Sequence, residues 1–281
     1  TIVLRGAMDG LAVVPPIADP DYPALRRDLA IGTPGLEQTL PLDGFFGLNN
    51  AMPSLHAMYQ AGDALIVHAV ASPYRDRSHF DGQDVLESGM IGAKMSDSGW
   101  MNRVAEAMPQ GEAVRPVTGL AATPTVPLIL RGAAPTLTWT PPELPPASGD
   151  TRDRLLDLYT HRDPDMARVF AAGIETDRLA GNGDPVKAPA GLAAAFAQIA
   201  TGSARLVVEE DGPRIAVLSY DGWDTHTNEG ADSGRLAGLL GALDGALAAL
   251  QQTLAPVWQD TVIAVVTEFG RTARENGTEG T

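Results

Sequence analysis

An aspartate and a histidine two residues apart, Asp224 and His226, follow an apolar stretch at residues 215–219. In an extended segment, residues two apart point to the same side. A carboxylate and an imidazole together suit Zn²⁺, Mn²⁺ or a similar divalent cation. The same spacing is also consistent with a turn in which Asp224 caps the next helix and His226 lies in solvent.

A second segment, ASPYRDRSHF at residues 71–80, combines two arginines with a serine and a histidine. Ser78 is a natural helix N-cap, and a helix N-terminus beside Arg75 and Arg77 can bind an anion. A phosphate or sulfate ester on this loop would face a hydroxyl that a nearby metal could activate. We therefore predict Ser78 and His79 as catalytic residues, and Arg75 and Arg77 as anion-binding residues.

Two alternatives for this segment stay open. The attacking group could be Ser72 or a water molecule in place of Ser78, because all three would lie within one loop. The arginines could also serve only to neutralise the acidic side chains around a capped helix, namely Asp76, Asp81 and Asp84.

A third loop, EFGRT, begins at Glu268 directly after the apolar stretch TVIAVVT. A carboxylate at the carboxyl end of a buried strand faces the ligand site of an open α/β sheet. We predict Glu268 as a catalytic base or ligand and Arg271 as a further anion-binding residue. The alternative is an ion pair between Glu268 and Arg271 that holds the loop. Asp9 beside Gly10, after the first apolar stretch, would allow a ligand to approach closely or would form an ordinary turn.

Composition narrows the classes of function. The chain has 281 residues with 20 Lys and Arg against 35 Asp and Glu, so its formal net charge is −15. Such a charge argues against nucleic acid or an anionic membrane as partner. Cysteine is absent, so any metal must be bound by His, Asp and Glu. No apolar run approaches the roughly 18 residues that span a bilayer.

The elements that must position these loops alternate between strands and helices. Continuous apolar stretches are typical of strands covered on both faces, and they occur at residues 1–4, 64–70, 126–130, 215–219 and 261–267. Helical periodicity is clearest at 232–254, where leucines recur every three or four residues. Weaker helices fit residues 53–61, 80–88, 100–108, 152–159, 164–172 and 191–200.

This alternation predicts an α/β fold with a mostly parallel central sheet sandwiched by helices. We expect one loop-rich domain over residues 1–281. Residues 132–149 contain too many prolines for a helix or a central strand, so they are predicted to form a surface loop.

Five motifs, in chain order, carry a resemblance to a known family. They are LRGAMDGL, PLDGFFGLN, HAVASPYRDRSHFDGQDVLESG, GWDTH and VVTEFGRT. The series resembles that of a bacterial family known as domain of unknown function 1501, which is similar to the alkaline phosphatase and sulfatase superfamily. The resemblance implies a sulfatase-like fold.

The same resemblance implies roles for single residues. Asp9, Asp224 and His226 would bind the metal, which would be zinc, manganese, calcium or magnesium. Ser78, or less well Ser72, would be the nucleophile. Phe269 stands where phosphatases carry a metal-binding Asp-His pair.

The resemblance also implies limits and a location. Relatives continue past GTEGT into an Asp-His-Gly segment, so this chain is expected to lack the C-terminal part of the family. In the sulfatase pattern Cys/Ser-x-Pro-x-Arg, Pro73 and Arg75 align but Ala71 takes the place of the nucleophile. Relatives carry a twin-arginine leader, which implies a periplasmic or otherwise exported protein, although no leader precedes Thr1.

From these observations we expect a metal-dependent hydrolase that acts on a small anionic phosphate or sulfate ester. The alternative is a non-catalytic extracytoplasmic protein that binds an anion or a glycan on the same fold. The sequence does not determine the substrate or the oligomeric state.

Overall fold

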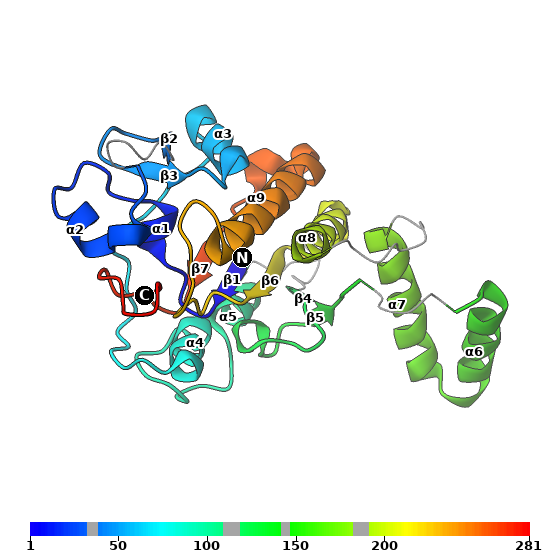
Figure 1. Cartoon of the computed structure of the whole chain (residues 1–281). Helices are drawn as coiled ribbons and strands as arrows, with labels where there is room; N and C mark the ends of the chain where they lie inside the picture. Colours follow the sequence, from blue (N-terminus) through cyan, green and yellow to red (C-terminus); the bar gives the residue numbers. More distant parts are fainter. Residues whose placement is uncertain (33–38, 109–118, 142–146, 182–190) are drawn as a thin grey trace.

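The centre of the protein is a five-stranded, all-parallel sheet, seen in a computed structural model that describes residues 1–32, 39–108, 119–141, 147–181 and 191–281. The strands follow the spatial order β5-β4-β6-β1-β7 (Figure 1). Their bounds are β1 Ile2–Arg5, β4 Gly119–Ala122, β5 Thr136–Thr138, β6 Ile215–Asp221 and β7 Val265–Thr267. A separate antiparallel pair joins β2 Thr39–Pro41 to β3 Gly47–Asn49. The parallel α/β sheet that the sequence predicts is confirmed.

Helices surround this sheet. The α-helices are α1 Gly10–Val13, α2 Tyr22–Arg26, α3 Pro53–Ala61, α4 His79–Ser88, α5 Trp100–Ala107, α6 Gly149–Arg162, α7 Pro164–Gly181, α8 Leu192–Val208 and α9 Arg235–Thr253. Short 3₁₀ helices span Arg27–Leu29, Leu128–Leu130 and Ala255–Asp260. Each helix expected from the sequence is present, and α6 to α8 extend beyond the predicted ends. Within the described residues, every helix is too short or too polar to cross a lipid bilayer.

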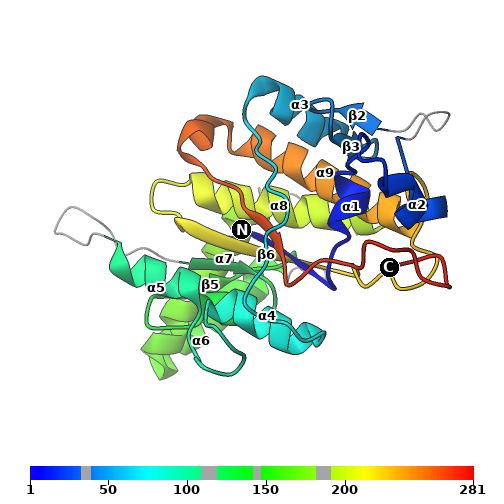
Figure 2. The same ribbon diagram turned by 90° about the vertical axis from the view of Figure 1, so that its left-hand side faces the viewer.

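Successive residues of the strands fill two separate cores. Leu4 of β1 and Leu218 of β6 point to the face covered by α8 and α9, whereas Val3 and Val217 point to the opposite face with α5. Figure 2 shows α3, α8 and α9 on one side of the sheet and α4 and α5 on the other. Burial on both faces explains why these strands are continuously apolar.

Helix α9 connects β6 to β7 and buries the leucine face that its periodicity predicts. Leu236, Leu240, Leu243, Leu247 and Leu250 are all buried. Strand β1 lies between β6 and β7 in the sheet and pairs in parallel with both. The carboxyl ends of these three strands therefore lie side by side, and they place the loops after β1, β6 and β7 together.

Two predicted strands are wrong. Residues 64–70 form an extended connection from α3 to α4, which lie on opposite sides of the sheet (Figure 2), and Leu65 and Val67 are exposed. Residues 126–130 instead contain the 3₁₀ turn Leu128–Leu130, which follows Pro127 and is buried against the sheet. An apolar run indicates burial or contact, but it does not by itself make a strand that pairs.

Two strands of the central sheet were missed, as was the antiparallel pair of β2 and β3. Strand β4, Gly119–Ala122, consists of small residues and one leucine, so it lacks the β-branched signal of a strand. Strand β5, Thr136–Thr138, lies inside the segment predicted as a proline-rich surface loop, and that part of the prediction is wrong. Residues 142–146 of the same segment lie outside the described residues.

Two helix glycines test this packing. A Cβ at Gly202 of α8 would lie 2.1 Å from the buried ring of Trp139, whereas a Cβ at Gly245 of α9 would meet nothing within 4 Å. Gly202→Ala should lower the free energy of unfolding by about 1–3 kcal/mol through overpacking. Gly245→Ala should raise it by roughly 0.5–1 kcal/mol through helix propensity. Urea unfolding followed by circular dichroism measures both, and equal effects of the two substitutions would contradict the packing of α8 on Trp139.

Candidate functional site

The loop after β6 alternates between buried and exposed side chains. Trp223 and Thr225 are fully buried, whereas the side chains of Asp224 and His226 are 47% and 62% exposed. Trp223 packs in the core below α9 and edge-on against the ring of Tyr220. The buried tryptophan therefore fixes an extended segment whose aspartate and histidine point outward on the same side, as their spacing predicts.

The loop after β1 crosses this segment at very short range. A Cβ at Gly6, which has φ = +119°, would lie 2.5 Å from the backbone nitrogen of Asp224. Only glycine accepts both this backbone conformation and this close approach. The backbone N–H of Gly6 donates to Glu268 Oε1 at 2.8 Å, which joins the β1 loop to the end of β7.

His79 is the first residue of α4, so the start of that helix sets its position. Ser78 is the N-cap, because its hydroxyl oxygen accepts a hydrogen bond from the backbone N–H of Asp81 at 3.3 Å. One turn further along α4, Gln83 faces the same direction as His79, and both side chains reach Glu268. The N-cap role predicted for Ser78 is confirmed.

Glu268 is a fully buried carboxylate that collects several hydrogen bonds at the end of β7. Its Oε1 accepts from Gly6 N–H, from His79 Nδ1 at 2.9 Å and from Gln83 Nε2 at 3.2 Å, and its Oε2 accepts from the Thr267 hydroxyl at 3.0 Å. Burial alone would raise the pKa of Glu268, but these hydrogen bonds outweigh it and hold the pKa below its usual value.

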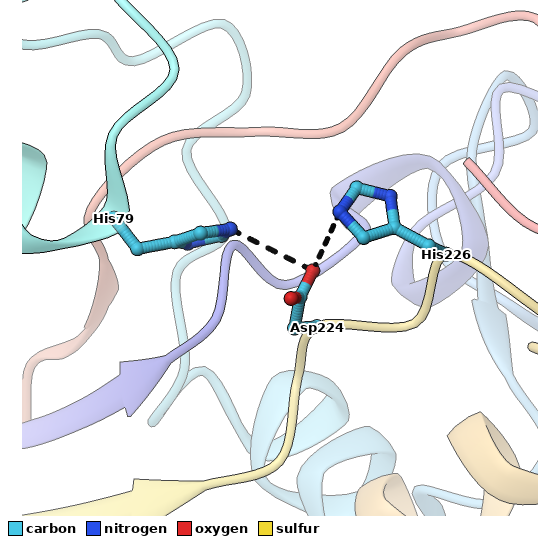
Figure 3. Close-up of side chains that lie close together, drawn as sticks. All are labelled: His79, Asp224 and His226. Carbon is cyan, nitrogen blue, oxygen red and sulfur yellow. Dashed lines mark ion pairs between the residues drawn. The ribbon is translucent and has the colours of Figure 1, made fainter.

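Three side chains that could ligate a metal ion, those of His79, Asp224 and His226, lie close together (Figure 3). Asp224 Oδ1 lies 2.9 Å from His226 Nε2 and 3.6 Å from His79 Nε2. One ligand atom from each of the three residues lies within 4.8 Å of the other two. Ligands at about 2.0–2.1 Å from a tetrahedral Zn²⁺ are roughly 3.3 Å apart. Two imidazoles and one carboxylate in this arrangement could hold a divalent cation with a coordination position left open.

In each histidine, the ring nitrogen that does not face Asp224 lies within hydrogen-bond distance of another oxygen atom. Nδ1 of His79 faces Glu268 Oε1, and Nδ1 of His226 lies 3.1 Å from the main-chain oxygen of Thr281. With the proton on Nδ1, the lone pair of Nε2 points toward Asp224 in both residues. Oxygen atoms that hold the second nitrogen in this way are the usual outer partners of metal-binding histidines.

Arg271 lies beside the same three residues. Its Nη2 donates to Asp224 Oδ1 at 2.6 Å, and its Nη1 lies 3.0 Å and 3.3 Å from the two ring nitrogens of His226. Burial alone would raise the pKa of Asp224, but the hydrogen bond and the charge of Arg271 hold it below its usual value. The alternative of an ion pair between Glu268 and Arg271 is wrong. Glu268 contacts His79, and Arg271 pairs with Asp224.

A pocket of about 590 Å³ opens next to this cluster. It is lined by Arg77, His79, His226, Phe269, Gly270, Arg271, Thr272, Asn276 and Thr281. Two histidines and two arginines thus line one cavity of a protein whose net charge is −15. Phe269 stacks near His79, with ring centroids 4.9 Å apart, and forms an apolar part of the wall.

Below the cluster lies a second group of buried charges. Asp9 caps α1, and its carboxylate forms an ion pair with Arg26 in which both side chains are 1% exposed. Glu229 is fully buried and accepts hydrogen bonds from the hydroxyls of Thr225 and Thr281 at 2.9 Å and 3.1 Å. Burial and the nearby carboxylate of Asp9 raise the pKa of Glu229 to about 7.

The structure therefore brings together five of the nine predicted site residues: His79, Asp224, His226, Glu268 and Arg271. Arg77 lines the pocket beside them. The side chains of the other three have partners outside the cluster. Asp9 faces Arg26, the guanidinium of Arg75 donates to the carbonyls of Ser72 and Tyr74, and the hydroxyl of Ser78 caps α4.

Gln83, Glu229 and Arg26 were missed by sequence reasoning. His79 was predicted as a catalytic residue beside a serine nucleophile, but the structure places it with two other side chains that could ligate a metal. Gln83 follows it at the helical spacing of four residues, and that spacing was a usable signal. The contacts of Glu229 with Thr281 and of Arg26 with Asp9 gave no local signal, because these partners are 52 and 17 residues away.

Comparisons with known proteins give one match. The family model described as "Protein of unknown function (DUF1501)" matches residues 49–281. No curated protein and no solved structure matches the chain.

The raised pKa of Glu229 predicts a pH-dependent stability. Between the ordinary value of 4.5 and about 7, the folded state holds a proton that the unfolded state has released, so the free energy of unfolding falls as pH rises through this window. Glu229→Gln cannot ionise and keeps both hydroxyl contacts. It should be more stable than the parent by about 1–3 kcal/mol at pH 8, with a smaller difference at pH 5.

Urea unfolding at the two pH values measures this effect. The exposed Glu210→Gln is the matched control and should leave the pH dependence unchanged. A difference for Glu229→Gln that is the same at pH 5 and pH 8 would contradict a raised pKa.

Proposed function

The chain belongs to the DUF1501 family, whose description names no activity, and from the geometry of the site we propose that it is a metal-dependent hydrolase of phosphate or sulfate esters. The observation that carries this proposal is the meeting of His79, Asp224 and His226 beside a pocket that both histidines line together with Arg77 and Arg271. Imidazole and carboxylate ligands suit zinc or manganese best among the divalent cations considered.

A divalent cation at these residues would stabilise developing negative charge and lower the pKa of an oxygen nucleophile. The protein's own groups supply orientation and charge. Glu268 fixes the ring of His79, the buried Trp223 fixes the segment of Asp224 and His226, and Arg77 and Arg271 present guanidinium groups to the ester. Guanidinium groups bind the tetrahedral oxygens of phosphate and sulfate through paired, charge-assisted hydrogen bonds.

We propose water as the attacking group. The hydroxyl oxygens of Ser78 and Ser72 accept hydrogen bonds from backbone N–H groups of their own turns, and neither residue lines the pocket. The water oxygen would bond to phosphorus or sulfur, the ester P–O or S–O bond would break, and the proton lost by water would pass to the leaving alcohol. Charge stabilisation is the main requirement of such a transfer.

The engagement of both serines also supports a second candidate. A protein that only binds an anion or a glycan needs the guanidinium groups and the pocket but no nucleophile. In that case the metal would orient the ligand and no bond would break.

We further propose that the protein works outside the cytoplasm. This proposal rests on the likeness of its motifs to an exported family and is compatible with the absence of cysteine. None of the described helices can span a bilayer, and this finding is compatible with an exported protein as well.

The first test removes the carboxylate ligand. Asp224→Asn takes away the only negative charge among the three metal-ligating residues, so it should weaken Mn²⁺ or Zn²⁺ binding by at least tenfold and abolish metal-stimulated hydrolysis of 4-nitrophenyl phosphate and sulfate. Asp221→Asn, an exposed position three residues earlier, is the matched control. Anion binding without hydrolysis of either ester by the metal-loaded parent would favour the binding protein.

The second test concerns the nucleophile. Ser78→Ala removes the N-cap of α4 and should lower the free energy of unfolding by about 1 kcal/mol. Because the proposed nucleophile is water, the same variant should keep metal-stimulated kcat within a few fold of the parent. Loss of kcat by several orders of magnitude in a folded Ser78→Ala protein would identify the serine as the attacking group instead.

A further inference from the structure

We propose that Arg271 and the divalent cation exchange places at Asp224, so that metal and anion bind cooperatively. The cation displaces the guanidinium from the carboxylate, and the displaced guanidinium binds the anion in the adjoining pocket. This inference rests on the metal site of the proposed function and adds a mechanism for its loading.

The first argument is the identity of the contacted atoms. Arg271 Nη2 donates to Asp224 Oδ1 at 2.6 Å, and Nη1 lies 3.0 Å from His226 Nδ1 and 3.3 Å from its Nε2. Asp224 Oδ1 and His226 Nε2 are the same two atoms that face each other at 2.9 Å in the cluster of metal-ligating groups. A dication on this oxygen would repel the guanidinium at close range, so metal coordination through Oδ1 favours release of Arg271.

The second argument concerns the other hydrogen bonds of the Arg271 guanidinium. Its remaining contacts are to main-chain oxygens, Trp223 O at 3.3 Å and Thr281 O at 3.2 Å. Its Nε is buried and makes no hydrogen bond to any group in the described part of the chain. A guanidinium with one side-chain carboxylate partner and an unsatisfied donor gains hydrogen bonds when an anion with several oxygens becomes its partner.

The third argument is the position of the pocket. Arg271, His226 and Arg77 all line it. A guanidinium that leaves Asp224 therefore needs no passage through the protein to meet an anion, because it already borders the cavity. Gly270, beside it in the chain, has no atom within 4 Å of its would-be Cβ, so this side of the loop is not packed against other elements.

Thermodynamic linkage makes the coupling reciprocal. If metal frees Arg271 for the anion, then the anion must raise metal affinity by the same factor that the metal raises anion affinity. Coupling of this kind is typically about 5–150-fold in binding constants. Without Arg271 the metal should bind more tightly by itself, and the response to anion should be lost.

The experiment measures Mn²⁺ binding by electron paramagnetic resonance of the free ion, with and without inorganic phosphate, on the full chain. For the parent, phosphate should strengthen Mn²⁺ binding at least fivefold. For Arg271→Gln, Mn²⁺ alone should bind at least fivefold more tightly than to the parent, and phosphate should add less than twofold. Arg274→Gln, an exposed arginine in the same loop, is the matched control and should behave as the parent.

Arg271→Lys provides a second variant in case the glutamine variant does not fold. Its single ammonium cannot contact Asp224 and His226 as a fork does, so Mn²⁺ alone should bind it more tightly than the parent. Unchanged or weaker Mn²⁺ binding by folded Arg271→Gln or Arg271→Lys, or an equal phosphate effect in Arg271→Gln and the parent, would overturn the exchange.

The outcomes separate this inference from the proposed function. If the parent and Arg271→Gln both bind Mn²⁺ with the same affinity and the parent hydrolyses esters, the exchange is wrong and the hydrolase stands. If no variant binds Mn²⁺, the metal site itself is wrong and both fall.

Discussion

The buried carboxylate of Glu268 is the interaction on which the arrangement of the site depends. It accepts hydrogen bonds from the loop after β1, from the first turn of α4 and from its own strand end, so one side chain connects three segments far apart in the sequence. Burying a carboxylate without partners would be strongly unfavourable. Full hydrogen bonding offsets that cost, and it also makes the positions of Gly6 and His79 mutually dependent.

The site separates a buried frame from exposed reactive groups. Glu268, Trp223 and Thr225 are buried and fix the backbone, whereas Asp224 and His226 project into solvent beside the pocket. A rigid support below accessible ligands is what metal binding requires, because the ligand atoms must converge without being sealed from a substrate. The Gly6 crossing contributes by bringing the β1 loop against the backbone of Asp224.

Charge is distributed in layers around this frame. Below it, Asp9 and Glu229 are buried near Arg26, and burial together with Asp9 raises the pKa of Glu229. Above it, Arg77 and Arg271 face the pocket of a strongly acidic protein. Guanidinium groups in such a protein create a local positive potential, which favours a small anion over a large polyanion.

Local periodicity was sufficient for much of the fold. The leucine spacing of α9, the capping serine of α4 and the apolar runs of β1 and β6 were read correctly, because they depend on residues close in sequence. The strand predicted at 64–70 failed, and β4 and β5 were missed, because strand pairing depends on distant partners. A run such as ALIVHAV carries the same local signal whether or not a neighbouring strand is available to it.

The sequence by itself determined the chemical types of the site and the shared direction of Asp224 and His226, since a two-residue spacing in an extended segment requires it. Only the tertiary structure decided that His79 joins them, that Glu268 pairs with this histidine and that Arg271 pairs with Asp224. It likewise turned Asp9 toward Arg26 and left Ser78 as a helix cap. Those choices depend on distances between residues up to 189 positions apart, which are set by the order of strands in the sheet.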